Sequence, residues 1–323
     1  MVTQTRERML ATNRLNRSLL GVLSLIAGVT VFSLQDLVLK FISGEYPLHE
    51  AMTVRSLVAI PCLLLLLKFE GGIRLLSTPR WKIHLGRGAI MFFAYTFYYL
   101  ALAALPIATC TAIWFAAPLF ITALSVVVLK EQVGWRRWLG IVAGLLGVLI
   151  MLRPGSSLFA WASLLPLCAA LGYSISMTIA RKTGGVDAAS AMAFYANLAF
   201  CAGALVLTAI FGSGAFATSG DASLGFLTRS WVWPTAFDLG LMMSTGVVAG
   251  LGITLLTNAY KVARGSVVAP FEYTAMVWGV LNGWLFFGDW PDATAWLGIA
   301  IIIGSGLYVL YRDKVRSAST SSP

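Results

Sequence analysis

Four charged residues stand inside long apolar segments, where a charge needs a chemical reason. Asp36 and Lys40 lie four residues apart in the first apolar segment, Arg55 lies in the second and Glu272 lies in the ninth. A charge inside a membrane-spanning helix costs about 2.5–3.5 kcal/mol, so such residues are typical of ion pairs or of substrate and proton sites. We therefore expect these four residues to decide what the protein does.

The sequence leaves more than one interpretation open for each of these charges. Asp36 and Lys40 share a helix face, so they can form a permanent ion pair or one that opens when a substrate or proton arrives. Lys40 can also extend to the membrane surface. Arg55 can pair with Asp36 or Glu50, or bind a substrate carboxylate with two parallel hydrogen bonds. Glu272 can pair with a cation on another helix, or hold a substrate amino group or a proton.

Aromatic and amide side chains in the same apolar segments could line a substrate cavity. Aromatic walls with few polar groups suit flat or apolar parts of a substrate. The same side chains can instead pack helices together or form hydrogen bonds between them. The candidates are Tyr95, Tyr99, Trp114, Tyr173, Asn197, Asn258 and Tyr273.

The composition decides which class of protein carries these residues. Of the 323 residues, 59% are hydrophobic and 11% are charged, and the mean hydropathy is +0.83. Soluble domains carry about 25% charged residues, so a cytosolic enzyme, a secreted disulfide scaffold and a disordered protein are excluded. The apolar runs are continuous rather than alternating, which favours helices over a barrel. The sequence therefore predicts an all-α polytopic membrane protein.

Motifs for enzymatic or energy-coupled chemistry are missing from the sequence. It contains no G-x-x-x-x-G-K-[ST] phosphate loop, and His49 and His84 lack metal-ligand spacing. The four cysteines lie inside apolar runs, without the spacing of disulfides or metal sites. We expect no cofactor, no metal and no enzymatic activity.

Ten transmembrane helices are expected from the apolar runs. Pro47, Pro106 and Pro291 mark tight connections between them. Pro270 comes just before Glu272 and predicts a locally broken helix beside that carboxyl group. The expected spans are 19–41, 50–67, 88–105, 107–129, 137–152, 159–180, 189–211, 236–259, 266–287 and 292–311.

The positions of the cations orient these spans. With the connections placed alternately on two sides, 19 of the 23 Lys and Arg residues fall on one side, together with both termini. Cytoplasmic loops carry such an excess, so segments 1–18 and 312–323 are expected in the cytoplasm. The net charge of +10 is therefore a topology signal and does not indicate a nucleic-acid partner.

An internal repeat divides the chain into two halves. A shift of 158 residues places Glu131 on Asp289 and the W-L-G-I string at 138–141 on the same string at 296–299. A weaker match at a shift of 141 places Lys40 on Arg181. Each half, 19–152 and 159–311, holds five spans. Because five is odd, the second half must enter the membrane inverted, an arrangement typical of secondary transporters around a central cavity.

These features resemble a known family. The W-L-G start of the last helix in each half, the acidic residue before it, and the A-P-F-E-Y-T string at 269–274 followed by Trp278 and Asp289 are similar to the drug/metabolite transporter superfamily, EamA type. The resemblance covers essentially the whole chain. It implies a ten-helix basket with a central cavity that works by alternating access.

The resemblance also sets the functional expectation. It implies a secondary transporter in a bacterial inner membrane, and we expect export of amino acids with aromatic or apolar side chains, by facilitated diffusion or proton exchange. The alternative is uptake of a larger metabolite such as riboflavin or S-adenosylmethionine, and a membrane-embedded enzyme or scaffold is the third interpretation. The expected partners are the lipid bilayer, a small-molecule substrate and, as a coupling ion, the proton. The assembly is expected to be a monomer or a weak homodimer.

Overall fold

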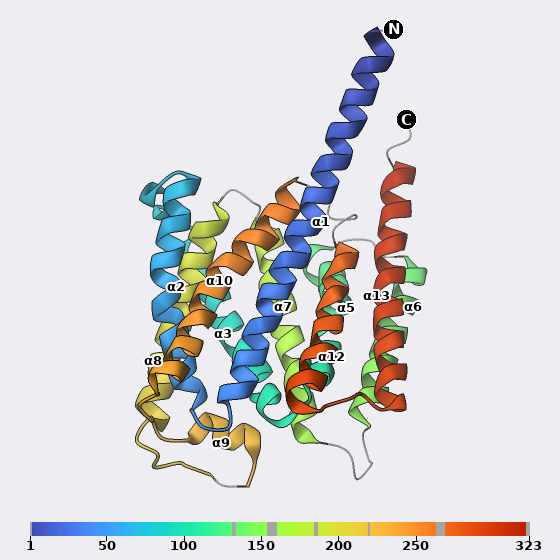
Figure 1. Cartoon of the computed structure of the whole chain (residues 1–323). Coiled ribbons are helices and arrows are strands. Elements are labelled where there is room, and N and C mark those ends of the chain that lie inside the picture. The colour runs from blue at the N-terminus through green and yellow to red at the C-terminus, as the bar shows by residue number, and fades with distance from the viewer. Residues whose placement is uncertain are drawn as a thin grey trace.

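The computed structural model of the chain is all-helical over the residues that it describes, 2–130, 134–153, 160–183, 187–218, 220–262 and 269–320 (Figure 1). Short 3₁₀ turns lie between or beside the α-helices: η1 (Ile73–Leu76), η2 (Trp161–Ser163) and η3 (Ala269–Tyr273). The α-helices are α1 (Val2–Ile42), α2 (Leu48–Glu70), α3 (Trp81–Ala104), α4 (Ile107–Trp114), α5 (Ala117–Leu129), α6 (Trp135–Leu152), α7 (Leu164–Thr183), α8 (Ala189–Phe211), α9 (Ala222–Thr228), α10 (Ala236–Val262), α12 (Thr274–Phe287) and α13 (Ala293–Thr320).

The helices have the length and apolar character of membrane spans. Within the described residues, six helical segments are long and apolar enough to cross a membrane. Shorter apolar helices follow over Trp138–Leu152, Ala236–Gly252 and Ala293–Tyr308. The prediction of an all-helical chain is confirmed for the described residues, and these segments are consistent with a polytopic membrane protein, whereas the count of ten spans stays a prediction. The six segments are Leu19–Ile42, Leu48–Glu70, Trp81–Ala104, Ile107–Leu129, Trp161–Ala180 and Ser190–Phe211.

The first residues of the helices are predicted better by prolines than by charged residues. Helix α2 begins directly after Pro47 and α4 directly after Pro106, because proline fits the first turn of a helix but not its interior. Helix α3 begins at Trp81, seven residues before the expected start of the third span. Its first two turns therefore carry His84 and Arg87, which the sequence had placed in the preceding loop.

Two helical segments break at positions that the predicted repeat would make equivalent. The first break separates α4, which ends at Trp114, from α5, which begins at Ala117. The second separates η3, which ends at Tyr273, from α12. Phe115 and Tyr273, one at each break, are 158 positions apart, which is the shift of the sequence repeat. The broken helix that Pro270 predicts beside Glu272 is present as η3.

Helices from the two halves of the chain pack against each other throughout the bundle. Helix α1 packs on α10, α3 on α7, α2 on α8, α6 on α13 and α4 on α12. The α6–α13 contact is close because it uses glycine: a Cβ on Gly298 would lie 2.3 Å from Cγ of Met151. Small residues allow such approach between membrane helices. The fold is therefore a single bundle in which helices of the N-terminal half pack against helices of the C-terminal half.

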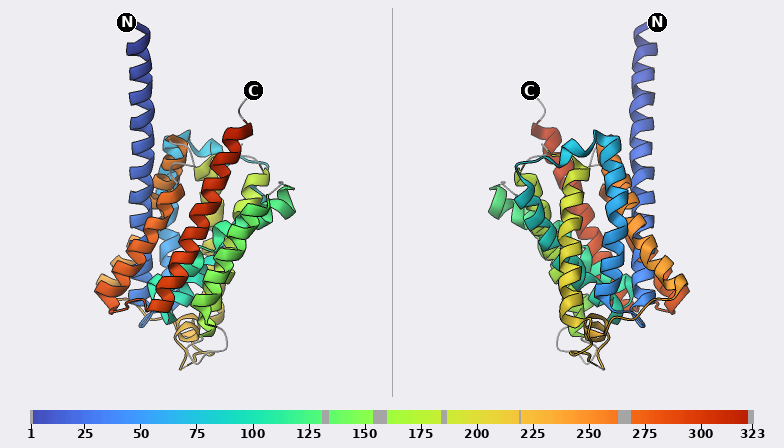
Figure 2. Two further views of the ribbon diagram at one scale, coloured as in Figure 1. Left: turned by 90° about the vertical axis from the view of Figure 1, so that its right-hand side faces the viewer. Right: turned by 90° about the vertical axis from the view of Figure 1, so that its left-hand side faces the viewer.

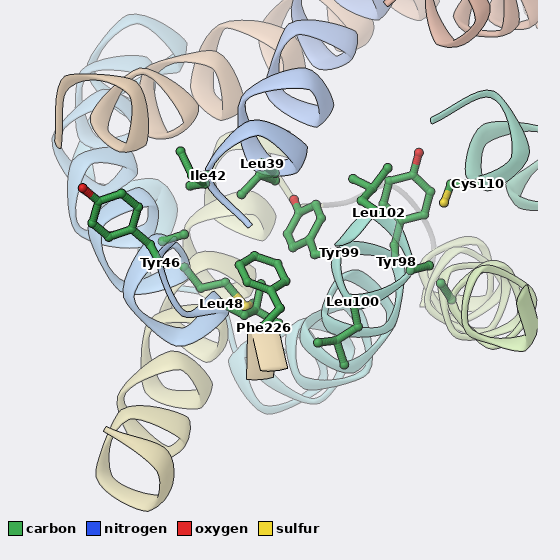
Figure 3. Packing of buried hydrophobic residues seen from close by; sticks show 14 of the residues in the cluster. Leu39, Ile42, Tyr46, Leu48, Tyr98, Tyr99, Leu100, Leu102, Cys110 and Phe226 are labelled. Atoms are coloured by element: carbon green, nitrogen blue, oxygen red, sulfur yellow. The ribbon is translucent and has the colours of Figure 1, made fainter. Parts of the chain in front are cut away.

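The two ends of the bundle differ in what covers them. Both termini lie at one end, and α9 with the segments around it lies across the opposite end (Figures 1 and 2). Phe226 of α9 is fully buried there, in a cluster that contains Leu48 and Tyr99 (Figure 3). We call the end at which the termini lie the terminus end, and the opposite end the α9 end.

Candidate functional site

A cavity of about 560 Å³ lies inside the bundle. Its walls come from α1, α2, α3, α4, α7, α8, α10, η3 and α12, so both halves of the chain contribute. Ligand sites of about 300–1,000 Å³ bury most of a drug-sized molecule, so the cavity has the size of a small-molecule site. It extends from the middle of the bundle toward the terminus end, where His84 and Arg87 line it.

An aromatic wall forms the inner part of the cavity. We use this name for Tyr95, Tyr98, Trp114, Tyr173 and Phe200. The Trp114 ring centroid lies 5.2 Å from that of Tyr98 and 5.1 Å from that of Tyr173, and the Tyr95 centroid lies 5.6 Å from that of Phe200. Tilted and edge-on pairs at these separations hold each other in place. The wall therefore presents rigid ring faces and edges from four different helices, α3, α4, α7 and α8.

Charged and amide side chains stand beside the aromatic wall. The Tyr98 hydroxyl donates a hydrogen bond to Asp36 Oδ2 at 3.1 Å. Arg55 Nε donates to Gln35 Oε1 at 3.3 Å, and the Arg55 guanidinium lies 5.1 Å from the centroid of the Phe200 ring. A guanidinium over a ring gains a cation–π attraction, which holds it at the cavity without a direct carboxylate contact. One acid and one cation thus line the same space.

Lys40 has a different role from the one that its spacing to Asp36 suggests. Its Nζ lies 3.6 Å from Asp289 Oδ2, donates to the Leu105 carbonyl at 2.5 Å, and lies 5.0 Å from the Phe287 ring centroid. Asp36 is engaged by Tyr98 instead. The pairing of Asp36 with Lys40 within one helix is therefore not the arrangement in this structure, because Asp289, in the connection between α12 and α13, reaches Lys40.

Glu272 and Tyr273 diverge although they are neighbours in sequence. Glu272 lines the cavity from η3. Tyr273 is not among the lining residues, and its ring lies 4.8 Å, centroid to centroid, from that of Phe115, which does line the cavity. The 3₁₀ conformation of η3 turns successive side chains by about 120°, which separates the two residues.

The predicted site residues divide into three groups: residues that line the cavity, residues that lie outside its lining, and one residue whose side chain the structure does not describe. Asn197 lines the cavity and donates to the Ser56 carbonyl at 3.0 Å. Lys40, Tyr99 and Tyr273 lie outside the lining, and Tyr99 accepts a hydrogen bond from Gln35. Asn258 belongs to α10, but its side chain lies outside the described residues. The residues that the structure brings together are Asp36, Arg55, Tyr95, Trp114, Tyr173, Asn197 and Glu272.

The sequence reasoning missed several lining residues. Gln35 precedes Asp36 and lines the cavity with it, and Tyr98 lies there in place of Tyr99. Tyr95 and Tyr98 are three residues apart, so they share a helix face as readily as a pair four apart. His84 and Arg87 were missed because the expected span began after them.

Hydrogen bonds and ion pairs close the α9 end. Tyr46 Oη donates to Asp238 Oδ2 at 2.7 Å, and Arg229 Nη1 donates to the Tyr46 carbonyl at 3.1 Å. Ser223 of α9 donates to the Leu100 carbonyl at 2.7 Å. Together with the Lys40–Asp289 pair, these bonds join helices of both halves. None of the residues in these contacts lines the cavity, so the contacts lie between the cavity and this end of the bundle.

An exposed ion pair lies at the same end. Arg153 Nη2 contacts the carboxylate of Asp292, whose side chain is 57% exposed. The hydrogen bond from Arg153 lowers the pKa of Asp292 below its ordinary value of 3.8, and the carboxylate in turn raises the pKa of Arg153. The pair links the end of α6 to the beginning of α13.

The chain is similar to known membrane transporters. Residues 19–153 match the EamA-like transporter family. The chain is 26% identical over 299 residues to an S-adenosylmethionine uptake transporter of Rickettsia prowazekii (strain Madrid E), covering 93% of this chain and 95% of that one. It is 29% identical over 303 residues to a riboflavin transporter of Rhizobium johnstonii, covering 93% and 94%.

Two further similarities concern an exporter and the fold. A pseudopaline exporter, CntI, of Pseudomonas aeruginosa is 25% identical over 288 residues, covering 88% of this chain and 93% of that one. A solved crystal structure matches with a TM-score of 0.60 at 18% identity, covering 96% of this chain and all of the other. The latter supports the fold alone.

Proposed function

We propose that this chain, an EamA-type member of the drug/metabolite transporter superfamily, takes up a flat heteroaromatic metabolite of the size of riboflavin or S-adenosylmethionine. The family and the relatives identify a membrane transporter of a small molecule. Uptake of a larger metabolite was the alternative to amino acid export in the sequence interpretation. The similarity to uptake transporters over most of the chain now favours that alternative.

The observation that carries this proposal is the aromatic wall inside a cavity of about 560 Å³. A flat ring system gains most from stacked and edge-on contacts with other rings. Three of the wall's rings meet around Trp114, at centroid distances of 6.0 Å or less. A free amino acid would leave much of such a cavity filled only with water.

The charges around the wall suit a substrate with both signs of charge. Asp36 and Glu272 line the cavity together with Arg55. Carboxylates can hold an ammonium or sulfonium group, which ring faces also attract, and a guanidinium can hold a carboxylate with two parallel bonds. In this proposal the substrate contacts are Asp36, Arg55, Tyr95, Trp114, Tyr173, Asn197 and Glu272.

The proposed mechanism is alternating access by ten transmembrane helices in two inverted repeats, 19–152 and 159–311. The helix contacts support it: α1 with α10 and α3 with α7 are pairs that such a repeat exchanges, whereas α2 with α8 and α6 with α13 are pairs that it maps onto themselves. The matching breaks at Phe115 and Tyr273 follow the same rule. Inverted repeats place the substrate near the midplane between the halves.

The proposed orientation has both termini in the cytoplasm of a bacterial cell, with the chain in the inner membrane. The cation excess at the terminus end supports it. The cavity then extends toward the cytoplasm while the α9 end is closed, which describes an inward-facing state. We propose a monomer or weak homodimer, with the proton as a coupling ion acting at Glu272.

Export of amino acids with aromatic side chains is the second candidate. The aromatic wall suits such side chains too, and one relative is an exporter. Alternating access is reversible, so the direction depends on the gradients and not on the fold.

The test is solute flux into proteoliposomes containing the purified protein. The panel is labelled riboflavin, S-adenosylmethionine, phenylalanine, tryptophan, methionine and leucine, each with and without a pH gradient. We expect saturable flux of riboflavin or S-adenosylmethionine and little flux of the amino acids. Flux of amino acids alone would replace the proposal with the second candidate, and product formation in detergent would indicate an enzyme.

A further inference from the structure

A second polar group lines the cavity nearer the terminus end. We call it the Arg87 subsite: His84 and Arg87 of α3 and Ser176 of α7. Arg87 Nε donates to the Ser176 carbonyl at 3.1 Å, and its Nη1 lies 3.6 Å from the sulfur of Met192. Both partners are neutral. Within the described part of the chain, the contacts of this guanidinium therefore leave its charge unbalanced.

Two buried polar atoms of the subsite have no hydrogen-bond partner among the described residues, Ser176 Oγ and His84 Nδ1. Ser176 is 0% exposed and His84 is 1% exposed. Buried polar atoms are normally hydrogen-bonded, and leaving one unpaired is costly. Two such atoms beside an uncompensated guanidinium indicate that a ligand completes the group.

One acid, Asp187, contacts the subsite, and its partner there is His84 and not Arg87. His84 Nε2 lies 2.8 Å from Asp187 Oδ2, and this hydrogen bond lowers the pKa of Asp187. Glu70 accepts hydrogen bonds from the Ser190 hydroxyl and backbone. Asp187 is hydrogen-bonded by His84 and Thr78, and the contacts given for Glu70 go to Ser190. An anion brought by the substrate would supply the charge that Arg87 requires.

The subsite continues the aromatic wall along the same helix faces. His84, Arg87, Met91, Tyr95 and Tyr98 recur every three or four residues on α3 and all line the cavity. At about 1.5 Å per residue, the lining from His84 to Tyr98 spans roughly 21 Å. On α7, Ser176 follows Tyr173 by one helical turn. A long ligand could therefore contact the wall and the subsite at once.

We infer that Arg87 and Ser176 bind an anionic group, a carboxylate or a phosphate, of a substrate whose ring lies on the aromatic wall, with His84 lining the same subsite. The inference rests on the proposed function and narrows it. The substrate class becomes a flat heteroaromatic ring joined to an anionic chain. The planar guanidinium suits both anions because it can donate two parallel hydrogen bonds to either.

The test uses two pairs of probes that differ only in the anionic group. One pair is S-adenosylmethionine and its decarboxylated form, and the other is riboflavin 5′-phosphate and riboflavin. Binding to the full chain in detergent is measured by titration calorimetry, and flux in proteoliposomes. We expect the wild type to prefer the anionic member of at least one pair. Arg87→Gln should weaken binding of that member roughly tenfold and leave binding of the member without the anionic group within about twofold of the wild type.

Matched variants separate charge recognition from folding. Lys82→Gln also removes one positive charge from α3, but on the exposed face, where Lys82 lies over the Trp81 ring. This variant should change the binding of neither member of a pair. Arg87→Lys should restore part of the preference, and Ser176→Ala should reduce it. The inference would be overturned if Arg87→Gln weakened binding of both members of a pair equally. It would also be overturned if the wild type bound both members of each pair with equal affinity.

The outcomes also distinguish the inference from the proposed function. If the wild type binds the anionic member of a pair more tightly but transports none of the ring compounds, the proposed function alone is overturned. Flux of both members of each pair with equal half-saturation would overturn the inference alone. Absence of both binding and flux for every probe would overturn both.

Discussion

The α9 end and the terminus end of the bundle are held together in different ways. At the α9 end, Lys40 pairs with Asp289, Tyr46 with Asp238, and Arg229 with the carbonyl of Tyr46. These contacts cross between the halves from several directions. At the terminus end, the described contacts join α2, η1 and α3 to α7 and α8, for example from Tyr195 to the Leu76 carbonyl.

In the proposed alternating-access cycle, the difference indicates which contacts must separate. The contacts at the terminus end lie on one side of the cavity, so the cavity can extend past them. The contacts at the α9 end surround the bundle axis, so opening that end requires several of them to separate together. Individually, hydrogen bonds of this kind contribute about 0.5–1.5 kcal/mol, which allows a reversible closure.

The largest expected effect comes from fixing the α9 end permanently. In Lys40→Cys with Asp289→Cys, a short bifunctional thiol reagent should join the two positions, because the native side chains meet at 3.6 Å. Flux in proteoliposomes should then fall to background and return after the bridge is reduced. Each single-cysteine variant treated with the reagent is the control. Full flux through a demonstrably bridged protein would show that the α9 end does not open.

The next effect concerns the aromatic wall, which lies between the two ends. Trp114→Ala removes the ring that contacts both Tyr98 and Tyr173. We expect binding of the ring substrate to weaken roughly tenfold, since a ring contact of this kind contributes about 0.5–1.5 kcal/mol beyond its buried area. Trp114→Phe should retain most of the affinity. If alanine and phenylalanine behave alike, Trp114 does not contact the substrate.

A smaller effect is expected at Glu272, which faces the cavity from the broken span. Glu272→Gln keeps the shape of the side chain and removes its charge. If Glu272 carries the proton, flux should persist but lose its dependence on the pH gradient. Tyr273→Phe, a neighbouring change outside the cavity lining, should leave that dependence intact. Unchanged coupling in Glu272→Gln would assign the residue a structural role.

The smallest effect is expected for the exposed pair Arg153–Asp292. Asp292→Asn should lower the free energy of unfolding by less than about 1 kcal/mol, because solvent screens exposed pairs. The lowered pKa of Asp292 means that its contribution is present above the ordinary value of 3.8 and is lost as the pH falls through the lower value. The midpoint temperatures of thermal unfolding in detergent should therefore differ between Asp292→Asn and the wild type at pH 7. They should become equal in strong acid.

The sequence predicts the helical elements well because each signal is local. Apolar runs determine the spans, Pro47 and Pro106 determine where helices begin, and Pro270 predicts η3. The start of α3 was wrong by seven residues because Lys82 and Arg87 were assigned to a loop. That one error removed His84 and Arg87 from the candidate site.

Contacts between distant segments could not be predicted in the same way. Lys40 and Asp289 are 249 positions apart, and nothing local favours that pairing over Asp36. The cavity lining contains Tyr98 and not the predicted Tyr99 for a related reason: helical spacing defines a face but not the neighbour that it meets. The aromatic wall was predicted in part, through Tyr95, Trp114 and Tyr173.

The contact between Phe115 and Tyr273 has a consequence for motion. Their rings lie 4.8 Å apart, and the residues are separated by the 158 positions of the repeat. In an inverted repeat, the pseudo-two-fold axis exchanges the two halves of the chain. This exchange replaces Phe115 by Tyr273 and Tyr273 by Phe115, so their contact stays the same. Contacts at the α9 end, in contrast, are exchanged with contacts at the terminus end. The contact would then be the same in the inward- and outward-facing states. It would act as the fulcrum about which the two broken spans rock.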